Sequence, residues 1–313
     1  MDSTFEKLGG EIRYLRRLVD KEDKLWSAFN PSIGINPFKG YGVTFRSSNY
    51  VILPHGELAT TYGNKIRNRV WFADLDDDLQ IQNLRQIDFS RSGYDLYRGV
   101  EDAKLLSRDG KWMFTAVAME RNIPMARYCE CYLDKDTTFV ENIVMYEGVN
   151  AMKPEKNWMT ANYKSPHFDY VYNGNGIVKD GKVIMRLFDN KDLAGLRGNT
   201  HLLDMGDGTY IAVMHKLLVS RGKQKFIIER QMYAADVQKD YYHYFVRINE
   251  YGWVIEMSEP FRFVSKGIEF AAGIIEKDGH FVVSFGKDDV SSHLAIIDKK
   301  KVLKLLKKID SPS

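Results

Sequence analysis

Three stretches of the sequence, EDAKLLSRDGKWMFTAVAM (101–119), NTHLLDMGDGTYIAVMH (199–215) and FAAGIIEKDGHFVVSFG (270–286), share one plan. In each, an apolar run leads to an Asp-Gly pair whose Gly lies nine residues after the start, and an aromatic-rich run follows. Asp-Gly favours the type I′ turn of a two-residue hairpin. A fourth pair, Asp180-Gly181, also stands between apolar runs. The stretches therefore predict repeated antiparallel hairpins.

Repeats of one β unit at separations of tens of residues are typical of propellers, which arrange small sheets around a central channel. The hairpins divide the chain into five units, at 41–90, 98–147, 158–195, 197–262 and 267–300. The expected fold class is all-β, a five-bladed β-propeller with short terminal helices. A sandwich or two small β domains would also accommodate hairpins of unequal length.

Both ends of the chain have helical patterns. Apolar spacing predicts a helix between Phe5 and Trp26, and KKKVLKLLKK from Lys299 predicts an amphipathic helix with a basic outer face. Two runs within the propeller, RVWFADL from Arg69 and ARYCECYLD from Ala126, are interpreted as the last strands of their units. The predicted organisation is an N-terminal helical extension (1–28), a single propeller (29–298) and a basic C-terminal helix or tail (299–313).

The composition excludes several classes of protein. The 313 residues are 44% apolar and 28% charged, as in a folded globular protein, and 45 basic against 42 acidic side chains leave a net charge of only +3. This balance lacks the basic bias of a dedicated nucleic-acid binder. The sequence shows no membrane-spanning run and no secretory signal, and Cys129 and Cys131 are poorly spaced for a disulfide. We expect a cytoplasmic protein with two buried thiols.

Polar and charged residues open several of the units. In a propeller the innermost strands line the channel, so residues at their starts gather at one mouth although they lie far apart in sequence. The openings contain Arg98, Glu101, Asp102, Lys156, Asn157, Arg197, Asn199, Lys266 and Glu269, beside Tyr94, Tyr97, Trp158 and Phe270. Aromatic faces with carboxylates and amides suit a sugar, whose C–H surface stacks and whose hydroxyls form hydrogen bonds.

Each candidate also has a purely structural interpretation. Glu101 and Asp102 would satisfy turn amides, and Lys156 would be solvated. His215 and His243, within apolar and aromatic strands, would be core residues. Only the coincidence of these residues at equivalent positions of the repeats favours a functional site.

The chain resembles the β-mannoside phosphorylases and hydrolases of glycoside hydrolase family 130 and the related mannosyltransferases of glycosyltransferase family 108. The resemblance covers about residues 29 to 298. It is carried by FNPSI from Phe29, RGVEDAK from Arg98, EKNW from Glu155, the strand ending at His215, and IEFAAGIIEKDGHFVVSFGKDD from Ile268. It implies a five-bladed propeller with the active site in the central channel.

The resemblance also implies roles for single residues. Asp102 aligns with a sugar-contacting aspartate and His215 with a phosphate-binding histidine, while Glu120 is the candidate for the proton donor. The family's Glu-Asp-Pro-Arg is Glu-Asp-Ala-Lys here, so Lys104 replaces an arginine. Lysine cannot make arginine's planar bidentate contact with phosphate. This departure favours a transferase over a phosphorylase.

The predicted function is transfer of a sugar from a phosphate-activated donor, either a nucleotide sugar or a sugar 1-phosphate, to a hydroxyl-bearing acceptor. The predicted catalytic residues are Glu101, Asp102 and Glu269. The predicted substrate- and phosphate-binding residues are Arg98, Lys104, Lys156, Asn157, Arg197, Asn199, His215 and His243. No cofactor and no metal is expected, since Asp76-Asp77-Asp78 is interpreted as a turn.

Three alternatives to this function stay open at the level of sequence. The first is a β-mannoside phosphorylase. The second is a glycan-binding propeller without activity, and the third is a protein-interaction scaffold. Nucleic acid as the acceptor would need a basic rim, for which Arg13, Arg16, Arg17 and the C-terminal lysines are the available residues.

Overall fold

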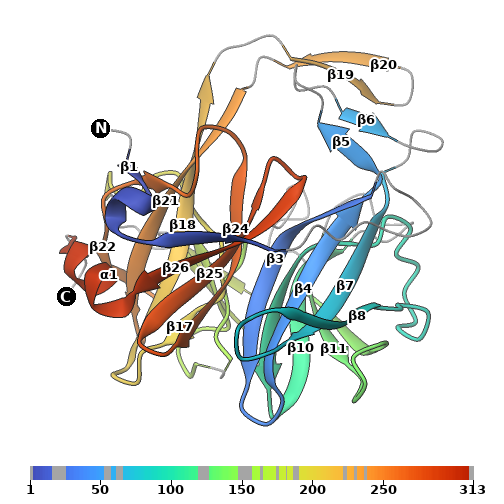
Figure 1. Cartoon of the computed structure of the whole chain (residues 1–313), viewed down its shortest axis with the longest axis horizontal. Helices are drawn as coiled ribbons and strands as arrows, with labels where there is room; N and C mark the ends of the chain where they lie inside the picture. The colour runs from blue at the N-terminus through green and yellow to red at the C-terminus, as the bar shows by residue number, and fades with distance from the viewer. Residues whose placement is uncertain are drawn as a thin grey trace.

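The computed structural model consists almost entirely of β-strands (Figure 1). The structure describes residues 3–15, 26–52, 58–60, 66–118, 127–146, 157–162, 165–173, 176–180, 182–185, 190–220, 224–228, 231–235 and 238–309. Its short helical segments are a 3-10 turn at Glu6–Leu8 and α1 at Lys299–Leu305, within the described residues.

The first two blades are regular four-stranded antiparallel sheets. Blade 1 contains β3 (Ser27–Asn36), β4 (Gly40–Ser48), β7 (Asn68–Leu75) and β8 (Ile81–Gln86). Blade 2 contains β9 (Val100–Arg108), β10 (Lys111–Ala118), β11 (Arg127–Leu133) and β12 (Val140–Met145). The runs RVWFADL and RYCECYL are therefore third strands, and their interpretation as last strands is wrong. The true outer strands, β8 and β12, are half exposed and carry little apolar signal.

Blades 3 and 4 form one continuous sheet, joined where Asn173 pairs with Arg197. Blade 3 contains β13 (Tyr170–Asn173), β14 (Gly176–Lys179) and β15 (Lys182–Met185), and residue 159 bridges to 171 on its inner side. Blade 4 contains β16 (Leu196–Gly198), β17 (Leu203–Asp204), β18 (Thr209–Ser220), β21 (Gln238–Asn249), β22 (Val254–Met257) and β23 (Phe261–Arg262). The hairpin of β19 (Gln224–Ile228) and β20 (Gln231–Ala235) projects beyond β18 and β21, near the pair β5 (Tyr50–Ile52) and β6 (Leu58–Thr60) (Figure 1).

Blade 5 takes its outer strand from the N-terminal part of the chain. It contains β24 (Glu269–Lys277), β25 (His280–Lys287), β26 (Ser291–Asp298) and β2 (Glu11–Tyr14). The short β1 (Ser3–Thr4) runs parallel to β23. The helix predicted from 5 to 26 is therefore wrong for residues 9–15: Glu6–Leu8 form a short 3-10 turn, and β2 supplies the fourth strand of the last blade. Residues 16–25 lie outside the described ones.

The predicted two-residue Asp-Gly hairpins are confirmed at two of the four pairs. Asp109 and Gly110 have φ of 51° and 74°, and Asp278 and Gly279 have φ of 49° and 74°. These positive values are those of a type I′ turn, which matches the twist of the flanking strands. At Asp207-Gly208 the prediction is wrong, because residues 205–208 separate β17 from β18 and Asp207 does not have a positive φ. Gly181 of the fourth pair lies outside the described residues.

The innermost strands touch one another in a closed ring. The Ser32 hydroxyl of blade 1 donates to the Ala272 carbonyl of blade 5 at 2.9 Å and accepts from the Leu105 amide of blade 2 at 2.9 Å. Blade 2 continues to blade 3 through Lys104, whose Nζ donates to the Trp158 carbonyl at 2.8 Å. The ring passes to blade 4 where the Leu202 amide donates to the Thr160 carbonyl, and to blade 5 where His201 bonds to the backbone of Ile274.

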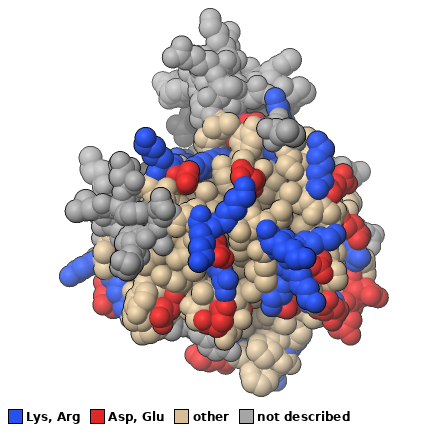
Figure 2. Space-filling view, turned by 90° about the vertical axis from the view of Figure 1, so that its left-hand side faces the viewer, with Lys and Arg blue, Asp and Glu red and all other residues tan. Residues whose placement is uncertain are grey.

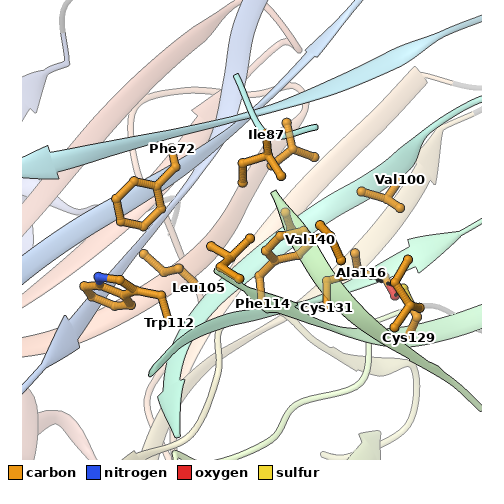
Figure 3. Packing of buried hydrophobic residues seen from close by; sticks show 14 of the residues in the cluster. Phe72, Ile87, Val100, Leu105, Trp112, Phe114, Ala116, Cys129, Cys131 and Val140 are labelled. Atoms are coloured by element: carbon orange, nitrogen blue, oxygen red, sulfur yellow. Dashed lines mark hydrogen bonds between the residues drawn. The ribbon is translucent and has the colours of Figure 1, made fainter. Parts of the chain in front are cut away.

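Five apolar clusters among the described residues occupy the five interfaces between neighbouring blades. Figure 3 shows the cluster between blades 1 and 2, in which Phe72 and Trp112 meet edge to face with ring centroids 5.6 Å apart. Ring closure and the five interfaces together confirm the predicted five-bladed β-propeller. They also place the starts of β3 and β9 next to each other.

The cysteines agree with expectation, and the C-terminal helix agrees in part, because it ends at Leu305 and Lys307–Lys308 form a short strand, β27, that pairs with β22. Cys129 and Cys131 are free and buried on one face of β11, with sulfur atoms 3.8 Å apart (Figure 3). Helix α1 buries Val302 and exposes lysines. On the face shown in Figure 2, basic side chains lie among acidic ones. Within the described residues, no helix is long and apolar enough to cross a membrane.

Candidate active site

Arg46 is the centre of a buried polar cluster at the start of the innermost strands of blades 1 and 2. Its side chain is 8% exposed, and Nη2 lies 3.3 Å from a Glu101 carboxylate oxygen. Nη1 donates to Asp102 Oδ1 at 3.2 Å, and Nε donates to Asn68 Oδ1 at 3.0 Å. Burial lowers the pKa of Arg46, but the nearby acidic groups, led by Glu101, outweigh it and raise this pKa above its usual value. The cluster holds two carboxylates beside one fixed cation.

Two backbone irregularities orient these side chains. The register of β9 against β10 shifts around Asp102, and that of β3 against β4 shifts around Asn30. Both residues have positive φ, 53° and 48°, which costs a non-glycine residue free energy. Asn30 Nδ2 donates to Asp102 Oδ1 at 3.0 Å. Since bulges redirect side chains, they bring an amide of blade 1 onto a carboxylate of blade 2.

A third carboxylate reaches the cluster from blade 5. Asp289 follows β25 with φ of 53°, and its Oδ2 accepts from the Tyr50 hydroxyl at 2.8 Å. Burial raises the pKa of Asp289, although Arg46 and the Tyr50 hydroxyl act in the opposite direction. Burial also raises the pKa of Tyr50. Asp289 is thus the carboxyl of this cluster whose surroundings favour the protonated form.

Blade 4 supplies the facing wall. Arg197, His215 and His243 lie directly opposite one another across β16, β18 and β21, so all three share one face of the sheet. Arg197 is exposed and has no ion pair with any described residue. The His215 ring stacks on Tyr241 at a centroid distance of 5.0 Å. Burial lowers the pKa of His215, and the charges of His243, Arg197 and Lys104 act in the same direction.

Tyr241 lies on β21 of blade 4 and responds to the charges of both walls. Burial raises its pKa to about 12, and the charges of Asp289 and Asp102 add to the rise, while the charge of Arg197 opposes it. One hydroxyl thus lies within electrostatic reach of carboxylates from blades 2 and 5 and of a cation from blade 4. The structure therefore brings together Asp102, Arg197 and His215 of the predicted site, at one end of the channel.

The side chain of Lys104 is buried and already forms a hydrogen bond within the protein. It is 2% exposed, and its Nζ donates to the Trp158 carbonyl at 2.8 Å. Burial lowers the pKa of Lys104 to about 7, although the charge of Asp102 acts against this. His201, buried nearby, has a pKa lowered by burial to about 4, and the charge of Lys104 lowers it further. Lys104 thus ties blade 2 to blade 3.

Two predicted site residues have structural roles instead. Glu269 is fully buried, and its carboxylate accepts hydrogen bonds from the amides of Phe263, Val264 and Ser265 at 2.7–2.9 Å. His243 is fully buried, and its Nε2 lies 3.0 Å from the Glu269 carbonyl; burial lowers its pKa to about 3. The Glu269 carboxylate holds the 263–265 turn and the His243 ring is bonded to the Glu269 backbone, so we remove both from the candidate catalytic and substrate-binding set.

The remaining residues of the predicted site are either buried, at the opening of a blade, or outside the described part of the chain. Asn199 is fully buried, and neither polar atom of its side chain has a hydrogen-bond partner among the described residues. Asn157 has φ of 66° at the opening of blade 3. The Arg98 carbonyl accepts from the amide nitrogen of Asn68 at 2.8 Å. Lys156 and Glu120 lie outside the described residues.

Sequence reasoning missed several members of the cluster. They are Arg46, Tyr50, Asn68, Tyr241 and Asp289, of which the first three lie in or beside blade 1. Arg46 lies on the second strand of its blade, whereas the sequence pattern pointed to residues that open the first strand of each unit. Asp289 could have been predicted from the sequence, because the acidic pair that ends FGKDD follows an apolar strand. The described residues contain no group of three His, Cys, Asp or Glu side chains that could hold a metal ion.

Comparison with known proteins supports the fold. No protein-family model and no curated protein matches the chain. Among solved structures, a β-1,2-mannobiose phosphorylase from Listeria innocua matches with a TM-score of 0.58 and 11% identity, covering 94% of this chain and 99% of that one. MPT-1, a GDP-Man-dependent mannosyltransferase from Leishmania mexicana, matches with a TM-score of 0.55 and 11% identity, covering 92% and 89%. A glycosyl hydrolase from Bacteroides ovatus matches at 0.51 and 12%, covering 87% and 84%.

The chain has the fold of these carbohydrate-active proteins. The resemblance predicted from the sequence is therefore confirmed for the fold. At such identities the comparison carries no residue roles, so the function rests on the cluster around Arg46 and on its facing wall.

Proposed function

We propose that this protein transfers a glycosyl group from a phosphate-activated donor to a hydroxyl of an acceptor, in the channel of the propeller. The observation that carries the proposal is the pairing of two walls. Glu101, Asp102 and Asp289 lie around Arg46 on one wall, while Arg197 lies on blade 4 without an ion pair among the described residues, and the charges of Asp102, Asp289 and Arg197 all act on the Tyr241 hydroxyl. Carboxylates suit sugar hydroxyls, and an open cation suits a phosphate.

The carboxylates would have distinct roles. Asp102 is held by Asn30 and Arg46, so its position is fixed before a sugar binds. Asp289 is the candidate for the general base that takes the proton from the acceptor hydroxyl, because a raised pKa makes its carboxylate a stronger base. Glu101 would fix the sugar by accepting hydrogen bonds from hydroxyls. These assignments replace Glu269, which is bound to three backbone amides.

Arg197 would bind the donor phosphate. Its guanidinium presents paired N–H donors that match phosphate oxygens, and its neighbour His215, neutral because its pKa is lowered, can offer one N–H. The fully buried Asn199, which directly follows β16, has both side-chain polar atoms unpartnered among the described residues and would add an amide. Lys104 would contribute its positive charge while its Nζ stays hydrogen-bonded to the Trp158 carbonyl.

Transfer from a nucleotide sugar is favoured over phosphorolysis of a glycoside as the reaction of this site. The residue that replaces the family's arginine, Lys104, is buried and bound to a backbone carbonyl, so it does not offer a forked phosphate clamp. MPT-1, which shares the fold, is described as dependent on GDP-Man. The mannobiose phosphorylase with the same fold keeps phosphorolysis as the second candidate.

A thermal-shift screen tests this proposal. The wild-type protein is heated with GDP-mannose, other nucleotide sugars, mannose 1-phosphate, inorganic phosphate and free sugars. A donor that binds the native state raises Tm by mass action, by about 2.7 kcal/mol of stability at a hundredfold excess over Kd. We expect a nucleotide sugar to give the largest shift. Shifts with glycans alone would contradict the proposal and support a glycan-binding propeller.

A further inference from the structure

The connection between blades 1 and 2 presents two exposed tyrosine rings. This connection, residues 89–99 and called the tyrosine loop below, ends two residues before Glu101. Tyr94 is 37% exposed and Tyr97 is 36% exposed. The Arg98 guanidinium carbon lies 5.2 Å from the centroid of the Tyr97 ring. The loop therefore combines aromatic surface with one adjacent cation.

The tyrosine loop is firmly anchored. Phe89 and Leu96 pack against the apolar cluster between blades 1 and 2. The Ser92 amide donates to the Phe89 carbonyl at 3.0 Å, and the Gly99 amide donates to the Leu96 carbonyl at 2.9 Å. Because the backbone is ordered by its own contacts, a ligand would meet the rings without having to order the loop.

One side chain ties the tyrosine loop to the carboxylates. Both the amide nitrogen and Nδ2 of Asn68 donate to the Arg98 carbonyl, at 2.8 and 3.1 Å. Asn68 Oδ1 accepts from Arg46 Nε at 3.0 Å, and Arg46 holds Glu101 and Asp102. The end of the loop is therefore fixed relative to the position of the transferred sugar.

We propose that the tyrosine loop is the acceptor subsite and binds a neutral oligosaccharide by stacking sugar rings on Tyr94 and Tyr97. This inference rests on the proposed function. The exposed cation proposed for the donor phosphate, Arg197, is on blade 4, and the carboxylates proposed for the transferred sugar are on blades 2 and 5. A loop between blades 1 and 2 therefore lies on the carboxylate side, away from the leaving phosphate. Aromatic faces attract the C–H groups of sugars and bury apolar area.

The charge of the tyrosine loop favours a neutral ligand. Its charged residues are Arg91, Asp95 and Arg98, a formal balance of +1. The Arg91 guanidinium carbon already lies 3.6 Å from the centroid of the Phe139 ring. A nucleotide base would also stack on tyrosine, and the experiment separates this outcome from an acceptor sugar.

The test is isothermal titration of β-1,2-mannobiose and longer β-mannooligosaccharides, and separately of GDP-mannose, into the folded protein. We expect Tyr97→Ala and Tyr94→Ala each to weaken oligosaccharide binding about fivefold to thirtyfold, the loss of part of a buried ring. GDP-mannose affinity should change less than twofold. Tyr97→Phe should retain the wild-type affinity, because it keeps the ring.

Phe38→Ala is the matched control, since Phe38 is 83% exposed in the turn at the opposite end of blade 1. It should leave both affinities unchanged. The inference is overturned if the tyrosine variants weaken GDP-mannose instead, or if oligosaccharide affinity is unchanged in them. If wild type binds GDP-mannose but no oligosaccharide, the inference alone fails. If it binds neither, the proposed function fails with it.

Discussion

Arg197 is the side chain whose loss should separate donor binding from folding. It is exposed and has no ion pair with a described residue, so Arg197→Ala should change the free energy of unfolding by less than about 0.5 kcal/mol. A charge-assisted hydrogen bond contributes about 1.5–3 kcal/mol, so donor affinity should fall on the order of tenfold to a hundredfold. Calorimetric titration with the donor measures this. Unchanged affinity in a folded variant would move the phosphate site elsewhere.

Lys104 should leave a signature in the pH dependence of stability. Its pKa is about 7 in the folded protein against 10.5 as the ordinary value. Between these values the unfolded chain binds the extra proton, so this group makes stability rise with pH, by at most about 1.4 kcal/mol per pH unit. Below pH 7 the lysine is charged in both states, so the free energy of unfolding stays lowered by the full cost of burying that charge.

Lys104→Met removes this contribution and leaves the Trp158 carbonyl bonded to the Tyr128 hydroxyl at 3.0 Å. Urea denaturation of both proteins from pH 7 to 10 measures it. The stability of wild type relative to the variant should increase with pH across this window. A constant difference would show that Lys104 does not carry a lowered pKa.

At the residue scale, sequence reasoning found residues at strand openings and missed their partners. Asp102 and Arg197 were visible because polar residues at the start of apolar strands are conspicuous. Arg46 and Tyr50 were not, since a buried arginine on a second strand is recognisable only once its carboxylates surround it. The structural role of Glu269 was equally hidden, because it depends on amides of a turn four to six residues away.

At the element scale, the closing strand β2 and the segment before it decide the stability of blade 5. Phe5 is fully buried against Phe245, Phe261 and Phe263. Phe5→Ala should therefore lower the free energy of unfolding by about 3–5 kcal/mol. Urea denaturation checks this, with Phe38→Ala as the exposed control. Equal midpoints for the two variants would mean that the N-terminal segment does not close the blade.

Elements were predictable where turn chemistry was strong. The hairpins at Asp109-Gly110 and Asp278-Gly279 formed as expected, because only a few dipeptides suit a two-residue turn. The segment from 5 to 15 was misassigned, since Leu8 and Ile12 at a spacing of four satisfy a helical pattern equally well. Its strand pairing depends on β26, which lies about 280 residues away, so no local pattern shows it.

At the scale of the whole molecule, the repeat predicted the number of blades but not their boundaries. The first blade begins at Ser27 rather than at 41, because β3 precedes the first recognised hairpin. The last blade borrows β2 from the other end of the chain. This closure of the ring brings β24 beside β3 and so brings Asp289 to Arg46 and Asp102.

The most direct test of the account is turnover by wild type and Asp102→Asn, with the donor that shifts Tm most and β-mannooligosaccharides as acceptors. Mass spectrometry detects the extended product. We predict that wild type forms it and that Asp102→Asn lowers kcat at least about a hundredfold, while donor affinity changes less than tenfold. Equal turnover by both proteins, or glycan binding by wild type without transfer from any donor, would contradict glycosyl transfer at this cluster.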